Sequence, residues 1–375
     1  MLAVLAGCGG GASSHALLYP ASASAAPDAI AGSHSIFVAT TREPAADAAE
    51  VYGGGRAEAT SFARVDISVP SAHRIGEIER PKGKVSDPGK FFTATGVTGY
   101  RDAAAFERTL RADIAARGGR ALVMIHGYRN HFDDAIYRIT QVVHDSGYTG
   151  TPVLFSWASS GKTLDYVYDN NSATAARDSL EGTLRLLARA GARRIDVVAH
   201  SMGNWVTMEA LRQLAITGDR DLDGRLGDVV LASPDIDVDV FKAQMRRYGQ
   251  PDKPFFVMVS RDDRALDFSR LIAGNRPRLG GYADDKDIAK LGVVVVDLTG
   301  VSSNDSLNHA KFADNPLLVK MLGERLNEVD GLGDSETAVT DHINALARGL
   351  GQSVVSAAQI VITTPVSVLS VAVGN

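Results

Sequence analysis

The stretch Ile195-Asp-Val-Val-Ala-His-Ser-Met-Gly-Asn-Trp-Val is the most informative part of this chain about its fold. Its apolar, β-branched run stops at Ala199-His200, and a helical pattern starts directly after Ser201-Met202-Gly203. This pattern is typical of a strand that turns abruptly into a helix and exposes a serine at the carboxyl edge of a sheet. So sharp a turn needs small residues two positions before and two positions after the serine. Ala199, where glycine is more usual, and Gly203 meet that need, so the sequence predicts an elbow with Ser201 at its tip.

Short apolar segments alternate with helical patterns on both sides of this elbow. We expect strands at 120–126, 152–157, 229–232, 255–260 and 293–298, and helices at 103–117, 132–145, 169–190, 238–248, 265–273 and 315–327. Short strands that are apolar throughout and alternate with helices imply an α/β domain, with a mostly parallel central sheet and helices on both faces. Earlier strands are expected at 35–41 and 60–70, and residues 73–99 are expected to form loops.

Composition limits the classes of partner. The 375 residues are 45% hydrophobic and 22% charged, so a large core is available. The formal net charge is -5 and no basic stripe stands out, which argues against nucleic acid as a partner. The single cysteine excludes an intramolecular disulfide.

The two ends of the chain differ in composition from the part between them. Leu5-Ala-Gly-Cys8 is similar to a bacterial lipobox, in which the cysteine is lipidated, although only a short apolar run precedes it. We therefore divide the chain into a lipobox-like N-terminus with a flexible linker at 1–33, a single domain at 34–350 and an apolar C-terminal tail at 351–375. Lipidation of Cys8 would anchor the protein to a membrane of the bacterial cell envelope, in the periplasm; a cytoplasmic location is the alternative.

Reactive side chains follow the expected strand ends. In a mostly parallel sheet these ends meet at one edge, where the sites of this architecture lie. His126-Gly127-Tyr128 ends one strand, Asp262-Asp263 follows another, and His309 lies in a loop ahead of the last helix. Together with Ser201 they have the order Ser, Asp, His that triads on this kind of sheet follow.

Each member of the predicted triad has a role. His309 takes the proton of Ser201 as the general base, and Asp263 fixes the orientation of His309 and stabilises its imidazolium. The backbone N–H groups of Tyr128 and of Met202, the residue after the nucleophile, are the expected oxyanion donors.

Other carboxylates compete for the role of the acid. Asp263 is favoured over its neighbour Asp262, and Asp235 and Asp237, which follow the preceding strand, are lesser alternatives. Asp262 and Asp263 also suit a different role, as capping residues of the helix expected at 265–273.

Residues near the same strand ends are candidates for the substrate pocket. They are His126, Gly127, Trp157, Tyr166 and Tyr168, although packing of the following helix explains the aromatic residues as well. The chemistry of a serine nucleophile needs no metal or organic cofactor.

Asp219, Asp221 and Asp223 match the opening half of a calcium loop. Val230 stands where such a loop carries its bidentate glutamate. A solvated acidic turn is therefore favoured over a metal site.

Several segments together carry a resemblance to a known family. They are Phe37-Val-Ala-Thr-Thr-Arg, Tyr52-Gly-Gly-Gly-Arg, His126-Gly-Tyr, Phe155-Ser-Trp, Ala199-His-Ser-Met-Gly-Asn and Leu231-Ala-Ser-Pro-Asp-Ile-Asp, followed by residues 260–266 and 309–316. On these segments the chain resembles the α/β-hydrolase superfamily, and more narrowly a bacterial family of largely uncharacterised α/β-hydrolases, over about residues 34–330. The resemblance implies a serine hydrolase fold and implies no substrate.

Cleavage of an ester, most simply a carboxylic ester of a small molecule or lipid, is the function that these residues predict. Thioesterases, acyltransferases and peptidases use the same triad, so the acyl acceptor and the bond cleaved stay open. A non-catalytic, envelope-anchored binding protein on the same fold is the alternative from a different class.

Overall fold

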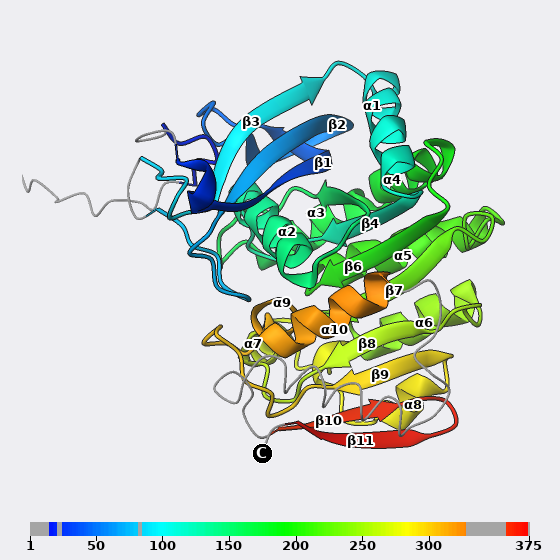
Figure 1. Ribbon diagram of the computed structural model, residues 1–375. Helices are drawn as coiled ribbons and strands as arrows, with labels where there is room; N and C mark the ends of the chain where they lie inside the picture. Colours follow the sequence, from blue (N-terminus) through cyan, green and yellow to red (C-terminus); the bar gives the residue numbers. More distant parts are fainter. Residues whose placement is uncertain (1–14, 21–24, 82–84, 328–357, 374–375) are drawn as a thin grey trace, which may run out of the picture.

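The computed structural model describes residues 15–20, 25–81, 85–327 and 358–373. Within them an 11-stranded sheet crosses the molecule (Figure 1). In sheet order its strands are β11 (Val368–Val373), β10 (Ala358–Thr363), β9 (Val293–Asp297), β8 (Phe255–Val259), β7 (Leu226–Ala232), β6 (Arg194–His200), β4 (Arg120–Ile125), β5 (Thr151–Ser156), β1 (Ile30–Pro44), β2 (Tyr52–Pro70) and β3 (Thr93–Tyr100).

Most of the sheet is parallel. Strands β1 and β4 to β9 share one direction. Antiparallel pairs with β2 and β3 extend one edge, and the antiparallel β10–β11 hairpin extends the other. The inner strands β4, β5 and β7 are buried along nearly their whole length because helices cover both faces. The predicted mostly parallel sheet with helices on both faces is confirmed.

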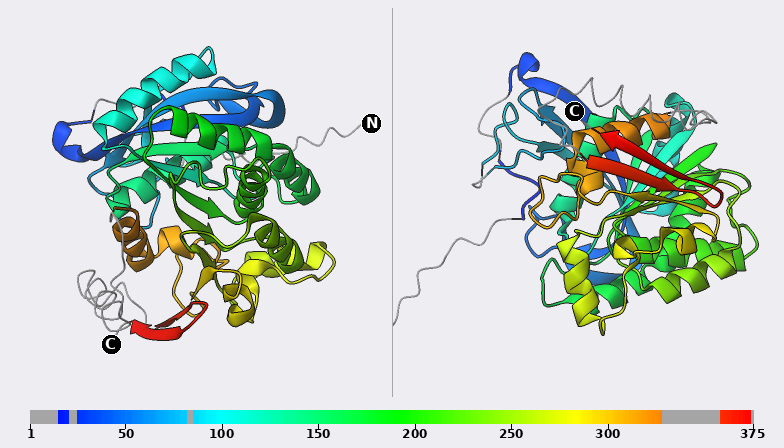
Figure 2. Two further views of the ribbon diagram at one scale, coloured as in Figure 1. Left: turned by 90° about the vertical axis from the view of Figure 1, so that its right-hand side faces the viewer. Right: turned by 90° about the horizontal axis from the view of Figure 1, so that it is seen from below.

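The helices divide between the two faces of the sheet (Figure 2). One face is covered by α1 (Ala103–Ala116), α4 (Arg177–Arg189), α5 (Gly203–Ile216) and α6 (Val238–Tyr248), and the other by α2 (Phe132–Ser146) and α10 (Pro316–Asn327). The shorter helices are α3 (Tyr166–Ala175), α7 (Arg264–Ile272), α8 (Asp285–Ala289) and α9 (Lys311–Asp314), with the 3₁₀ helices η1 (Pro27–Ala29) and η2 (Leu279–Gly281).

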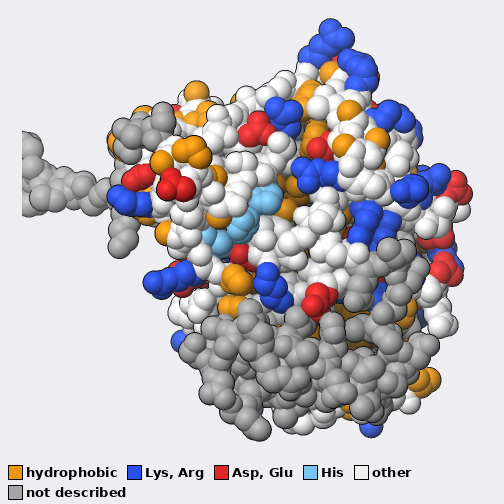
Figure 3. Space-filling model, in the orientation of Figure 1, with side chains coloured by type: hydrophobic (Ala, Val, Ile, Leu, Met, Phe, Trp, Pro, Cys, Tyr) orange, Lys and Arg blue, Asp and Glu red, His pale blue; other side chains and the backbone are white. Residues whose placement is uncertain are grey.

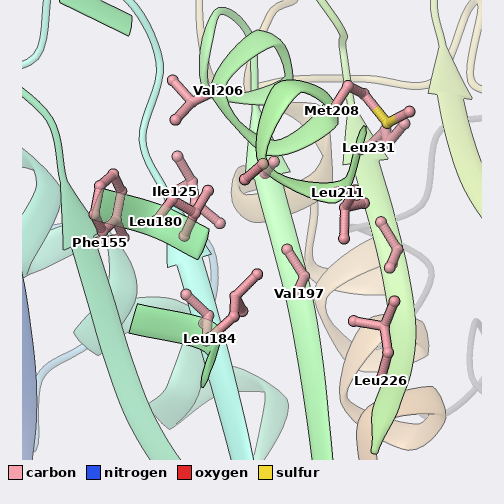
Figure 4. Packing of buried hydrophobic residues seen from close by; sticks show 14 of the residues in the cluster. Ile125, Phe155, Leu180, Leu184, Val197, Val206, Met208, Leu211, Leu226 and Leu231 are labelled. Atoms are coloured by element: carbon pink, nitrogen blue, oxygen red, sulfur yellow. The ribbon is translucent and has the colours of Figure 1, made fainter. Parts of the chain in front are cut away.

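Helices α4 and α5 hold β6 and its following turn in place. Figure 4 shows Leu180 of α4 and Val206 and Leu211 of α5 packed with Ile125 of β4 and Val197 of β6, all of them buried. Burial of one such side chain stabilises a fold by about 1.5–3 kcal/mol. The turn between β6 and α5 is therefore fixed by two well-packed elements.

Three elements differ from the sequence expectations. β3 lies within the residues expected to form loops, because this partly exposed edge strand contains Gly96 and Gly99 and lacks apolar alternation. The single helix expected at 169–190 is interrupted at Ala176, between α3 and α4. β2 begins at Tyr52 and not at residue 60.

The segments next to the two termini contact the domain. Leu17, within the segment expected to be a linker, is fully buried, and its N–H donates to the carbonyl oxygen of Ala49 at 2.8 Å. In the expected tail, β10 pairs with β9, and Ile360 and Val371 are buried. The tail therefore adds two strands to the sheet.

The expected lipidation site concerns the N-terminal end. Cys8 lies outside the described residues. Among the helices that the structure describes, none is long and apolar enough to cross a membrane.

Histidine side chains gather on the face shown in Figure 3. His34 of β1 and His144 of α2 place Nε2 and Nδ1 3.1 Å apart, and the ring centroid of His73 lies 5.5 Å from that of His144. His73 also bonds Asp145 at 2.7 Å and Glu79 at 2.8 Å. These contacts fasten the segment after β2 to α2.

Candidate active site

The predicted elbow places Ser201 in a strained turn between β6 and α5. Its φ is 54°, in the left-handed region that side chains other than glycine rarely adopt. The N–H of Ser201 donates to Ala232 at 3.0 Å, and Asn204 Nδ2 donates to the carbonyl oxygen of Ser201 at 2.9 Å. A non-glycine residue held in this region is characteristic of functional turns.

Small residues around the elbow allow three chain segments to meet. A β-carbon at Gly203 would lie 2.5 Å from the carbonyl oxygen of His126, and one at Gly127 would lie 2.7 Å from Cβ of Ser201. Ala199 is fully buried in β6. The small residues after and opposite the serine therefore serve close packing of the elbow against the end of β4.

His309 lies in the loop between β9 and α9 and hydrogen-bonds to Asp263, with Nδ1 2.7 Å from Oδ2. The other carboxylate oxygen of Asp263 accepts the N–H groups of Ala265 and Leu266, at 3.0 and 3.1 Å. Asp263 thus caps α7 and orients His309 at the same time. Capping and the role of the acid, which the sequence left as alternatives, occur together in one residue.

The neighbouring carboxylates face other partners. Asp262 forms an ion pair with the buried Lys311 at 2.6 Å and accepts a bond from Ser260. Asp235 accepts the hydroxyl of Tyr166 at 3.0 Å, and Asp237 caps α6. Of the four candidate acids, Asp263 is the one that hydrogen-bonds to His309.

Two side chains hold the backbone carbonyl group of His309. His200 Nε2 donates to the carbonyl oxygen of His309 at 3.1 Å, and Ser233 Oγ donates to it at 3.0 Å. Burial, followed by the charge of His309, lowers the pKa of His200 well below its usual value, so His200 stays neutral. His200 is therefore a hydrogen-bond donor to the His309 loop.

The surroundings of His309 favour its protonated form. Burial opposes protonation, but the hydrogen bond and charge of Asp263, with the charges of Asp235 and Asp305, outweigh it and raise the pKa of His309 above its usual value. An imidazole that gains stability on protonation suits a general base.

A cavity of about 620 Å³ contains the elbow and His309. Of the predicted pocket residues, His126, Gly127 and Tyr166 line this cavity. Further lining residues come from α2, α7, α9 and the 305–310 loop, among them Ala135, Arg138, Leu266, Phe268, Leu307 and Phe312.

Two aromatic residues expected in the pocket lie elsewhere. Trp157 is fully buried, stacks on His126 with ring centroids 5.1 Å apart, and donates from Nε1 to the carbonyl oxygen of His126 at 2.8 Å. Tyr168 bonds Gly54 at 3.0 Å and carries the guanidinium of Arg56 4.2 Å above its ring. The placement of both rings in the pocket was wrong, because neither lines the cavity: Trp157 supports His126 from behind, and Tyr168 packs against β2.

Comparison with known protein families identifies the family of this chain. A family model described as "Alpha/beta hydrolase of unknown function (DUF900)" matches residues 102–325, which is more than half of the chain and includes Ser201, Asp263 and His309. The chain belongs to this family. The predicted membership of a largely uncharacterised α/β-hydrolase family is confirmed.

Several solved structures are similar to this α/β-hydrolase at low identity. A Pyrobaculum calidifontis esterase is 14% identical, with 79% of this chain and 85% of that chain covered and a TM-score of 0.33. EstE1, a thermostable carboxylesterase cloned from a metagenomic library, is 12% identical, with coverages of 80% and 90% and a TM-score of 0.32. Aspergillus fumigatus lipase B is 12% identical with a TM-score of 0.29; the match covers 44% of this chain and 43% of the lipase. A comparison with curated proteins finds no match.

The expected oxyanion donors of the hydrolase have free N–H groups. Within the described part of the chain, neither the N–H of Tyr128 nor that of Met202 donates to another protein group. Tyr128 lies on the cavity wall, where its ring meets that of Tyr166 at 5.3 Å. Two unpaired backbone donors beside a strained serine match the requirement for holding an oxyanion.

A buried arginine holds the Tyr128 loop of the hydrolase. Arg42 is 1% exposed; its Nη2 donates to the carbonyl oxygen of Asn130 at 2.7 Å, and its Nε donates to Ser156 Oγ at 2.8 Å. Nη1 reaches the carbonyl oxygens of Gly53 and Ser159, at 2.9 and 2.8 Å. Arg42 therefore connects β1, β5 and the loop after β4.

Arg42, Ser233 and Lys311 entered the sequence analysis only as parts of family segments, with no role of their own, and Arg138 was missed altogether. An arginine at the end of an apolar strand was the one available signal for Arg42, because a charge there must find partners. The contacts of Ser233 and Lys311 join segments far apart in the chain, and no local pattern marks them.

The weak calcium candidate does not form a site. Asp219 binds Arg185 at 2.7 Å and the N–H of Asp223 at 3.0 Å, and Asp223 lies 3.4 Å from Arg225. Among the described residues the carboxylates of Asp219, Asp221 and Asp223 do not converge on one point. Ion pairs with arginine take the place that a cation would need.

Proposed function

We propose that this protein is a serine hydrolase that cleaves a carboxylic ester through an acyl-enzyme on Ser201. The observation that carries the proposal is the hydrogen bond between His309 and Asp263 in a site whose cavity also contains the strained Ser201. A general base must be oriented precisely. Here Asp263 is fixed by capping α7, and the backbone carbonyl of His309 accepts two hydrogen bonds.

In the proposed reaction Ser201 Oγ attacks the carbonyl carbon of the ester while His309 takes its proton. The N–H groups of Tyr128 and Met202 stabilise the oxyanion, and each such donor contributes about 3–4 kcal/mol. The carbonyl re-forms, the alcohol leaves with the proton of His309, and Ser201 keeps the acyl group. A water molecule then attacks the acyl carbon while His309 takes its proton. The bond from the acyl carbon to Ser201 Oγ breaks, His309 returns the proton to Oγ, and the carboxylic acid leaves.

Hydrolysis of small p-nitrophenyl esters tests this proposal. Wild type is expected to turn over the acetate or butyrate ester, and a Ser201→Ala variant is expected to lose the activity. Ser71→Ala, at an exposed serine away from the site, is the matched control and should keep wild-type rates. Equal turnover by wild type and Ser201→Ala would contradict the proposal.

The same proteins separate the related activities. Parallel assays with a thioester, an anilide and an added alcohol acceptor compare thioesterase, peptidase and acyltransferase chemistry with ester hydrolysis. A non-catalytic binding protein would give no turnover in any of them.

We also propose that Cys8 is the attachment point of a lipid, as the lipobox resemblance implies. Partition of the full-length gene product into a detergent phase, compared with a Cys8→Ala variant, tests this. Identical partition of the two proteins in the expressing bacterium would contradict lipidation.

A further inference from the structure

Exposed apolar side chains gather around the mouth of the catalytic cavity. Six of the large hydrophobic residues that the described chain exposes lie there: Leu164 at 94%, Val167 at 72%, Phe268 at 43%, Leu271 at 71%, Ile272 at 44% and Leu307 at 39% exposed. We call these six residues the apolar collar. Exposed apolar side chains concentrated on the segments beside one cavity are typical of an interaction site.

Hydrogen bonds connect the three segments that carry the apolar collar. Tyr166, beside Val167, bonds Ser269 of α7 at 3.0 Å, and the N–H of Arg264 at the start of α7 donates to the carbonyl oxygen of Leu307 at 3.0 Å. Phe268 and Leu307 also line the cavity itself, as does Thr163 next to Leu164. The collar therefore surrounds the entrance to the site and is continuous with its inner wall.

Helix α7 forms the centre of the collar. At helical spacing Arg264, Phe268, Leu271 and Ile272 share one face, while Leu266 is buried on the opposite side. A surface helix normally turns its polar face outward, so an apolar outward face calls for a partner.

Positive charge accompanies this apolar surface. Lys162, Arg264 and Arg276 are exposed in the collar segments, and within the described residues none of them forms an ion pair. Of the acidic residues in these segments, Asp267 is paired with Arg270 at 3.5 Å, and Asp165 and Asp305 add two negative charges. Apolar side chains interspersed with free cations complement an anionic lipid surface.

We propose that the apolar collar docks this hydrolase on an anionic lipid surface and that the ester enters the cavity from that surface. The inference rests on the proposed function for the identity of the reacting bond. A fluid lipid layer can deliver ester molecules to the entrance of the cavity. A protein bound to the apolar collar would instead block that entrance. Lipid esters held in a membrane or aggregate are therefore the substrate class.

Vesicle flotation tests the docking without catalysis. Every protein carries Ser201→Ala and Cys8→Ala, so that neither turnover nor an attached lipid contributes. The parent protein is expected to float with phosphatidylcholine vesicles that contain phosphatidylglycerol. A Val167→Ser/Leu271→Ser double variant should lose about tenfold or more in binding, since two apolar side chains no longer enter the lipid. Ile216→Ser, which alters a 39% exposed residue of α5 outside the collar, is the matched control and should bind like the parent.

Charge variants and a soluble-ester assay complete the test. Lys162→Gln with Arg276→Gln should reduce binding to the anionic vesicles and leave the melting temperature unchanged. Equal flotation of parent and double variant would overturn the proposal, as would a stable dimer that the double variant abolishes. If the vesicles bind the parent protein but the protein that retains Ser201 turns over no ester, the proposed function alone would be overturned. Turnover of soluble esters without flotation would overturn the docking alone.

Discussion

Asp263 Oδ2 lies 2.7 Å from Nδ1 of His309, while Oδ1 of the same carboxylate caps α7 through Ala265 and Leu266. The helix therefore fixes the direction from which the carboxylate meets the imidazole. Asp262, one residue earlier, is turned toward Lys311 and away from His309. Asp263 contacts His309 and its neighbour Asp262 does not, because Asp263 is the residue that caps the start of α7.

Asparagine substitutions at the two positions should give very different enzymes. Asp263→Asn removes the charge that stabilises the imidazolium and should lower kcat by about 10⁴-fold. Asp262→Asn should leave kcat within about tenfold of wild type and lower the melting temperature instead, because Lys311 loses its ionic partner. Steady-state kinetics on a p-nitrophenyl ester and thermal melts of both variants make the comparison. Comparable losses of kcat in both would contradict this division of roles.

The raised pKa of His309 predicts opposite pH trends for activity and stability. A base must be neutral to accept a proton, so kcat/KM should rise with pH through the pKa of His309. Because that pKa is raised, the plateau should be reached at a higher pH than for an ordinary histidine, whose pKa is about 6.5. The protonated His309–Asp263 pair stabilises the fold fully below the unfolded pKa, and that contribution disappears as pH rises through the folded pKa. A pH–rate profile and melting temperatures over the same range check both signs. In Asp263→Asn the activity limb should move to lower pH; an unmoved limb would assign the titration to another group.

Glycine substitutions test the packing of the elbow. Gly203→Ala drives a methyl group into the carbonyl oxygens of His126 and Ile125, at 2.5 and 2.7 Å, and should abolish activity and lower the melting temperature. Gly182→Ala is the control, since a β-carbon there meets no atom within 4 Å and α4 gains about 0.5–1 kcal/mol. A Gly203→Ala protein with wild-type activity would show that the elbow is not as closely packed as described.

Arg42 should matter for the rate more than for substrate binding. Burial lowers its pKa to about 10, which still leaves the guanidinium charged at neutral pH. Arg42→Gln releases the loop that carries the Tyr128 N–H, so kcat should fall about 10²–10³-fold, the cost of losing one oxyanion donor, with little change in KM. Arg56→Gln, at a partly exposed arginine of β2, should stay within about twofold of wild type. A pure rise in KM for Arg42→Gln would contradict the assignment.

Local sequence patterns predicted much of the fold. The β6–α5 elbow and the alternating strands were predictable because a buried parallel strand has to be apolar throughout. β3 was not predictable in the same way, since its Gly96 and Gly99 and its exposed position at the sheet edge remove that pattern. The pairing of β10 with β9 depends on a sheet edge that only the folded domain presents.

In the candidate site, too, local sequence could place some residues, whereas the positions of others depend on tertiary packing. Ser201, Asp263 and His309 each follow a strand end, so the sequence could place them at one edge. Trp157 has the composition of a pocket residue, but whether an aromatic ring lines a cavity or supports its wall depends on side-chain packing. Arg42 and Ser233 donate hydrogen bonds to backbone carbonyl oxygens of distant segments, and no local sequence pattern predicts such contacts.

Labelling with a fluorophosphonate tests whether Ser201 is an activated nucleophile, because the reagent reacts with activated serines and needs no knowledge of the substrate. The account predicts a single covalent adduct on the tryptic peptide containing Ser201, strongly reduced in His309→Ala and absent in Ser201→Ala. An unlabelled wild-type protein that is fully folded, or an adduct on another serine, would contradict it.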